Sequence, residues 1–190
     1  MPKRSAGILM YRRAARFQAE WKPVSRPESA PTLRSGARSD AKPASTFAER
    51  APGVEVLLVH PGGPFWQKKD AGAWTIPKGQ IESDEEALSA AKREFEEELG
   101  FKPEGKFIEL NAVKQKGGKI IRAWAFEGDC EPSRITSNKF SLEWPPKTGR
   151  KQSFPEVDRA AWFSVAEARR KILPGQSGFI DRLLAALDGK

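Results

Sequence analysis

Residues 83–99 limit what this chain can fold into more than any other segment, because nothing in them interrupts a helix. Ser83 and Glu86 have the spacing of a capping box at a helix start, and Gly100 suits a helix end. Apolar residues at helical spacing predict one buried stripe, formed by Leu88, Ala91, Phe95 and Leu99. The sequence therefore predicts an amphipathic helix that starts near Ser83 and ends at Leu99.

Three glutamates lie on a helix face beside that stripe. Glu94, Glu97 and Glu98 spread over about 100° of the helix circumference. Carboxylates at this spacing repel one another, and a divalent cation such as Mg²⁺ or Mn²⁺ removes the conflict because it prefers carboxylate oxygens. A solvated acidic face is the alternative, and it is the one that a run of glutamates alone would favour.

The residues around the glutamates favour the cation. They fit the pattern Gly-x5-Glu-x7-Arg-Glu-U-x-Glu-Glu-x-Gly-U, with U a bulky apolar residue, at Gly79, Glu85, Arg93, Glu94, Phe95, Glu97, Glu98, Gly100 and Phe101. Residues 79–101 thus resemble the Nudix box, the signature of the Nudix hydrolase family, at every position. The resemblance covers residues 5–12 and about 53–187. It implies the Nudix fold, an α/β/α sandwich around a mixed β-sheet.

The resemblance also implies a metal-dependent site centred on the box, with Mg²⁺ or Mn²⁺ as cofactor. Glu97 and Glu98 are the expected first metal ligands, and Glu94 is either a ligand or the carboxylate that activates water. Arg93 is expected to orient glutamates through bidentate hydrogen bonds. Glu85 is expected to brace the start of the helix or to contact a second ion.

Residues 74–79 are predicted to form a short strand that leads into the box. Their Trp-x-x-Pro-Lys-Gly form resembles Nudix hydrolases that act on dinucleoside polyphosphates and related highly phosphorylated substrates. The resemblance makes the Lys78 backbone carbonyl a metal ligand, and the Lys78 ammonium group can meet a phosphate. The expected substrate is a nucleoside diphosphate linked to another group, preferably a dinucleoside polyphosphate or an NTP.

Further candidate site residues lie downstream. In Nudix hydrolases an acid in the loop before the last strand often supplies a ligand or the base. Glu156 fits best and Asp158 is the alternative, because both precede the short strand expected at Trp162 and Phe163. Arg122 lies in another expected strand and is a candidate for substrate binding, with a structural surface role as the alternative.

Residues 60–72 are expected to form a loop in which aromatic side chains lie beside lysines. Trp66, Lys68 and Lys69 are candidate substrate contacts, because a ring can stack on a base and ammonium groups attract phosphate. The equal alternative is that Phe65 and Trp66 only attach the loop to the core.

The other elements follow from apolar runs and turn residues. Strands are expected at 6–11, 54–59, 107–113 and 119–126, a loop or lid at 127–155, and helices at 164–171, opened by a Ser164–Glu167 capping box, and 178–187. Arg12 and Arg13 are expected to end the first strand.

The sequence has one cysteine and one histidine. The single histidine excludes histidine-pair metal sites, and the single cysteine favours a reducing compartment. The histidine, His60, is expected in a turn.

The net charge of +8 comes mostly from residues 1–50, which hold 11 Lys/Arg against 4 Asp/Glu. We expect one domain over residues 1–190 with a basic insertion rich in Pro, Ser, Ala and Arg at about 14–52. An inert linker is the favoured interpretation of this insertion. A nucleic-acid-binding arm and a transit peptide are the alternatives.

No apolar run approaches membrane-spanning length, so a cytoplasmic protein without a membrane partner is expected.

Three functions remain open: a nucleotide pyrophosphohydrolase, an enzyme acting on RNA 5′ ends through the basic insertion, and a non-catalytic nucleotide-binding module. The first is preferred because no box carboxylate is missing. The sequence leaves the oligomeric state open.

Overall fold

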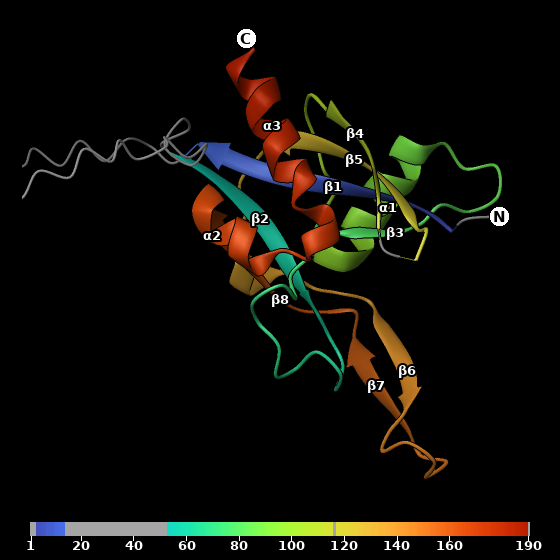
Figure 1. Ribbon diagram of the computed structural model, residues 1–190. Coiled ribbons are helices and arrows are strands. Elements are labelled where there is room, and N and C mark those ends of the chain that lie inside the picture. Colours follow the sequence, from blue (N-terminus) through green and yellow to red (C-terminus); the bar gives the residue numbers. More distant parts are fainter. Residues whose placement is uncertain (1–2, 14–52, 116, 190) are drawn as a thin grey trace, which may run out of the picture.

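The structure is a computed structural model that describes residues 3–13, 53–115 and 117–189 (Figure 1). The insertion expected at about 14–52 lies outside these residues. The strands of the described chain are β1 (Arg4–Arg13), β2 (Val54–Pro61), β3 (Lys78–Gln80), β4 (Ile108–Lys114), β5 (Ile120–Glu127), β6 (Lys139–Glu143), β7 (Lys151–Pro155) and β8 (Val157–Ser164). The helices are α1 (Ala87–Leu99), α2 (Val165–Lys171) and α3 (Gly178–Asp188), with 3₁₀ turns at Pro132–Arg134 and Pro174–Gln176.

The main sheet is mixed and has β1 near its middle. Its order is β4-β5-β1-β2-β8, and β3 pairs with β1 outside this path. β1 runs parallel to β5 and antiparallel to β2 and β3, with Gly7 opposite Lys78. This register places the strand that leads into the glutamate helix directly on the central strand of the sheet.

Helices cover both faces of the sheet, because the central strands are apolar on both sides. Leu9 and Leu58 pack with residues of α2 and α3 on one face, whereas Ile8 and Leu57 pack with α1 on the other. Figure 1 shows α2 and α3 together, apart from α1. The predicted α/β/α sandwich around a mixed sheet is confirmed.

Helix α1 begins later than the sequence predicted. Asp84 has a φ of 69°, a left-handed conformation that ends any helical path from Ser83. The Glu86 side chain caps the helix instead, accepting hydrogen bonds from the backbone N–H groups of Leu88 and Ser89. The capping box at Ser83 was therefore wrong, whereas the predicted end at Gly100, with a φ of 84°, is confirmed.

Residues 127–155 contain a β-hairpin where the sequence analysis expected a loop. β6 pairs antiparallel with β7, and Phe140 lies opposite Phe154. Figure 1 shows this hairpin projecting away from the main sheet. β8 follows at once and is longer than the short strand expected around Trp162.

Two smaller expectations were also wrong. β1 continues through Arg12 and Arg13, since Arg12 forms ion pairs with Glu55 and Asp129, both at 2.8 Å. His60 is not in a turn: it belongs to β2 and is fully buried.

Helices 165–171 and 178–188 match the predictions, and Ser164 caps the first of them. Within the described residues, no helix has the length and apolarity needed to cross a membrane.

Candidate active site

Arg93 connects the carboxylates of Glu85, Glu94 and Glu97 through hydrogen bonds. Its Nε and Nη2 donate to the two oxygens of Glu85, both at 3.0 Å, which is a bidentate pair. Its Nη1 donates to Glu94 at 3.0 Å and to Glu97 at 3.1 Å. Its Nη2 also donates to the backbone carbonyl of Gln80 at 3.1 Å. One guanidinium thus joins α1 to β3 and holds the pKa of Glu85 below its usual value.

Glu98 is the most enclosed acid of the box, with only 8 % of its surface exposed. Its Oε2 accepts a hydrogen bond from the Lys78 backbone N–H at 3.3 Å. Burial raises the Glu98 pKa to about 8; the Lys78 charge opposes the shift and the charges of Glu94 and Glu156 add to it. A bound cation would therefore compensate the negative charge of the Glu98 carboxylate better than its protein neighbours do.

Glu94 lies against a position that only glycine can occupy. A Cβ atom on Gly79 would lie 1.7 Å from Glu94 Oε2, so any side chain there would displace the carboxylate. Burial raises the Glu94 pKa, and Arg93 opposes that shift. The backbone of β3 can therefore approach the acids of α1 as closely as it does because residue 79 lacks a side chain.

The two candidate loop acids have different surroundings. Glu156 lies between β7 and β8, is exposed, and lies near enough for its charge to raise the pKa values of both Glu94 and Glu98. Asp158 faces His60 instead, with its Oδ1 2.7 Å from His60 Nδ1. The other His60 ring nitrogen lies 2.9 Å from the Lys69 carbonyl oxygen. This arrangement supports Glu156 over Asp158 as the further acid of the site.

Lys119 is a neighbour of the site that the sequence analysis missed. It is partly buried just before β5, and its pKa is lowered first by burial and then by the charges of Lys78 and Lys3. Glu94 and Glu98 act in the opposite direction, so Lys119 lies within electrostatic reach of both acids and lysines. The sequence carried no signal for it, because the long-range pairing of β1 with β5 brings these lysines together.

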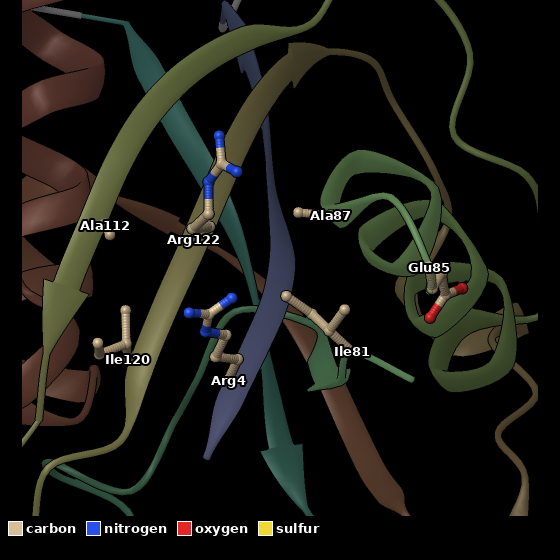
Figure 2. A pocket seen from close by; sticks show the side chains of 7 residues that line it. All are labelled: Arg4, Ile81, Glu85, Ala87, Ala112, Ile120 and Arg122. Atoms are coloured by element: carbon tan, nitrogen blue, oxygen red, sulfur yellow. The ribbon is translucent and has the colours of Figure 1, made fainter. Parts of the chain in front are cut away.

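Arg122 lines a pocket of about 380 Å³ beside the start of α1 (Figure 2). Figure 2 shows Arg122 and Arg4 on adjacent strands, with Ile81 and Ala87 near them and Glu85 on the helix side. Arg122 also donates to Glu109 at 2.8 Å, so it has a structural contact as well. Through Glu85, this pocket adjoins the hydrogen-bond network of Arg93.

The loop candidates Trp66, Lys68 and Lys69 form no described hydrogen bond or ion pair with this network. The Lys69 ammonium group lies 4.5 Å from the centre of the Trp66 ring, and Lys68 is exposed. Among the described residues, none of the three forms a hydrogen bond or ion pair with the glutamates of α1. Their part in substrate binding stays a prediction. Phe65 is 59 % exposed and contacts Trp144 of the hairpin rather than the core.

The carboxylate oxygens of Glu94, Glu97 and Glu98 suit a hard divalent cation, but the structure does not bring them together into a metal site. In the part of the chain that the structure describes, no three His, Cys, Asp or Glu side chains form a ready metal site. Arg93 holds Glu94 and Glu97, whereas Glu98 faces the Lys78 amide. The Glu94 carboxylate already occupies the space beside Gly79. Carboxylate oxygens such as those of Glu94, Glu97 and Glu98 are the ligands that Mg²⁺ and Mn²⁺ prefer.

Comparison with known proteins gives a family and a fold. The family model described as NUDIX domain matches residues 44–183. No curated protein sequence matches the chain.

Among solved structures, a Caenorhabditis elegans Ap4A hydrolase in a binary complex is similar, with a TM-score of 0.53 and 15% identity over 98% of this chain and 99% of that one. The NUDIX domain of Shewanella oneidensis NrtR, complexed with ADP ribose, has a TM-score of 0.53 and 14% identity over 98% and 89%. A MutT protein from Methanosarcina mazei Go1 has a TM-score of 0.51 and 16% identity over 100% and 97%. Identities this low establish the fold alone.

Proposed function

Because the chain belongs to the NUDIX domain family, we propose that it is a metal-dependent hydrolase that cleaves a phosphoanhydride bond in a nucleoside diphosphate linked to another group. The observation that carries the proposal is the enclosed Glu98, which lies beside the Lys78 backbone and within electrostatic reach of Glu94 and Glu156. Enclosing an acid in this way costs stability unless a cation compensates. The proposal includes a single cytoplasmic domain with a basic insertion at about 14–52.

The chain's own residues supply the other requirements of the reaction. Glu97, Glu98 and the Lys78 carbonyl would hold Mg²⁺ or Mn²⁺, which when bound neutralises phosphate oxygens and lowers the pKa of a water molecule. Arg93 positions the carboxylates through its bonds to Glu85, Glu94 and Glu97. Glu94, or Glu156 from the loop before β8, accepts the proton of the attacking water.

Lysines beside the acids favour a highly phosphorylated substrate. The ammonium groups of Lys78 and Lys119 lie within electrostatic reach of Glu94 or Glu98 and would bind phosphate oxygens that the ion leaves free. Arg122 and Arg4 line the pocket that includes Glu85, the carboxylate bonded to Arg93. A dinucleoside polyphosphate or an NTP has the charge to use these groups, and the fold shared with an Ap4A hydrolase agrees with this choice.

Product analysis tests the reaction. The protein, with Mg²⁺, is incubated separately with diadenosine tetraphosphate, NTPs, dNTPs, ADP-ribose, NADH and 5′-triphosphate RNA, and the products are separated by chromatography. We expect ATP plus AMP from the dinucleotide, because asymmetric cleavage leaves the longer phosphate chain on the lysines. Turnover of the RNA alone would instead support an arm that binds nucleic acid. Binding without turnover of any substrate would support a non-catalytic module.

Adding Mg²⁺ is expected to raise Tm, because the ion binds the folded acids and not the unfolded chain. An ion at 100 times its Kd contributes about 2.7 kcal/mol, and each kcal/mol raises Tm by about 2–4 °C in a chain of this size. Differential scanning fluorimetry measures the shift. Glu98→Gln is the matched variant and is expected to abolish most of it. An equal shift in both proteins would place the ion elsewhere.

A further inference from the structure

A second pocket, of about 360 Å³, lies between the loop that follows β2 and the β6–β7 hairpin. Gln67 and Pro64 line it from the loop side, and Trp144 and Gln152 line it from the hairpin. No residue of the 79–101 box lines this pocket, and the proposed reaction gives it no role.

The walls of the pocket are fixed against each other by close backbone contacts. The Gly62 N–H donates to the Glu156 carbonyl at 2.9 Å, and a Cβ on Gly62 would lie 2.0 Å from the Pro155 carbonyl oxygen. A Cβ on Gly63 would lie 3.1 Å from the Phe140 ring. The Phe65 ring contacts Trp144 edge to face, with centroids 5.4 Å apart. The loop and the hairpin therefore form one packed unit around the pocket.

The pocket adjoins the reaction site through the chain itself. Pro155 and Asp158 line it, and Glu156 lies between them. The Glu156 N–H donates to the Asn138 carbonyl at 2.8 Å, and the Asn138 N–H donates to the Glu97 carbonyl of α1 at 3.0 Å, so backbone hydrogen bonds connect this loop with the helix that carries the acids. Residues on both sides of Glu156 line this pocket, whereas the pocket of Figure 2, lined by Arg4 and Arg122, includes Glu85.

The lining favours a flat, neutral ring and disfavours phosphate. It contains no lysine or arginine among the described residues, and its one charged group, Asp158, is an anion paired with His60. Trp144 offers an aromatic surface for stacking. The side-chain amides of Gln67 and Gln152 have no hydrogen-bond partner in the part of the chain described here, and each carries both a donor and an acceptor. The edge of a nucleobase presents the complementary groups.

We propose that this pocket binds the nucleobase of the substrate, with Trp144 stacking on the ring and Gln67 and Gln152 reading its edge. The inference rests on the proposed function, since it takes the substrate to be a nucleotide. It makes the hairpin the element that distinguishes nucleotides from other diphosphates.

Binding of a non-hydrolysable nucleotide tests the inference separately from catalysis. Isothermal titration calorimetry with Mg²⁺ compares α,β-methylene-ADP, which has no phosphoanhydride bond, with methylenediphosphonate, which has no base. Trp144→Ala is expected to weaken nucleotide binding by about tenfold or more, the usual loss for one base-stacking contact. Binding of methylenediphosphonate is expected to stay unchanged. Gln152→Ala is expected to weaken nucleotide binding less.

Two variants separate recognition from folding. Trp144→Phe keeps an aromatic ring and is expected to retain most of the affinity. Ser153→Ala is the matched control for Gln152→Ala, because neighbouring residues of a strand face opposite sides and Ser153 does not line the pocket. Equal nucleotide affinity in Trp144→Ala and the wild type would overturn the inference, as would equal losses for both ligands or no nucleotide binding. Tight, Trp144-dependent binding without turnover of any substrate would contradict the proposed hydrolase and leave the base pocket standing.

Discussion

Replacing Glu97 by glutamine is expected to lower kcat by about 10²–10³-fold, because a metal ligand supports several kcal/mol of transition-state stabilisation. Glutamine keeps the size of the side chain but removes its negative charge. The Glu97 side chain is 37% exposed and bonds only to Arg93 within the described residues, so the substitution leaves the core intact. Steady-state kinetics on the substrate found by product analysis measures the loss.

Glu96→Gln is the matched control for Glu97→Gln. Glu96 is adjacent and exposed, and its side chain has no hydrogen bond or ion pair in the described chain. We expect near wild-type kcat for Glu96→Gln and equal urea midpoints for the two variants. If Glu97→Gln also retained wild-type kcat, Glu97 would not be a metal ligand.

Gly79→Ala is expected to lower kcat by about 10²-fold while the protein stays folded, since misplacing a reacting group by about 1 Å costs that much. The new methyl group would lie 1.7 Å from Glu94 Oε2, so the Glu94 side chain must rotate out of its position. The displaced atoms belong to a side chain, and the backbone of β3 can keep its pairing with β1. Activity and Tm, measured together, separate a displaced acid from a damaged fold.

Gly178→Ala is the control for the glycine substitution. Gly178 begins α3 on the other face of the sheet, and the nearest atom to an added Cβ, in the Val113 side chain, lies at 3.8 Å. Its activity is expected to equal that of the wild type. Wild-type kcat in Gly79→Ala would mean that Glu94 does not need its observed position for the reaction.

Local sequence patterns predicted the centre of this protein well. The glutamate helix, its end at Gly100 and the apolar stripe depend on residues within a few turns of one another, so spacing alone was sufficient. The helix start was harder to predict. Ser83 has the right chemistry for a cap, but Asp84 adopts a left-handed conformation and moves the cap to Glu86.

Features that depend on distant residues were not predictable in the same way. β6 alternates polar and apolar residues over only five positions, β7 does not alternate, and the turn between them contains Pro145 and Pro146, so the segment looked like a loop. His60 looked like a turn residue because Pro61 and Gly62 follow it, yet Asp158 and the Lys69 carbonyl satisfy it inside the fold. Lys119 joins the site only through the pairing of β1 with β5.

The central position of β1 has a consequence for how the chain folds during synthesis. β1 leaves the ribosome before the other described strands of the sheet, but its parallel partner β5 is made more than 100 residues later. The middle of the sheet therefore cannot form until residues up to about 127 have emerged. Until then the apolar faces of β1 lack their native partners. Such long-range pairing slows folding and leaves apolar strands exposed. Both conditions favour the binding of chaperones.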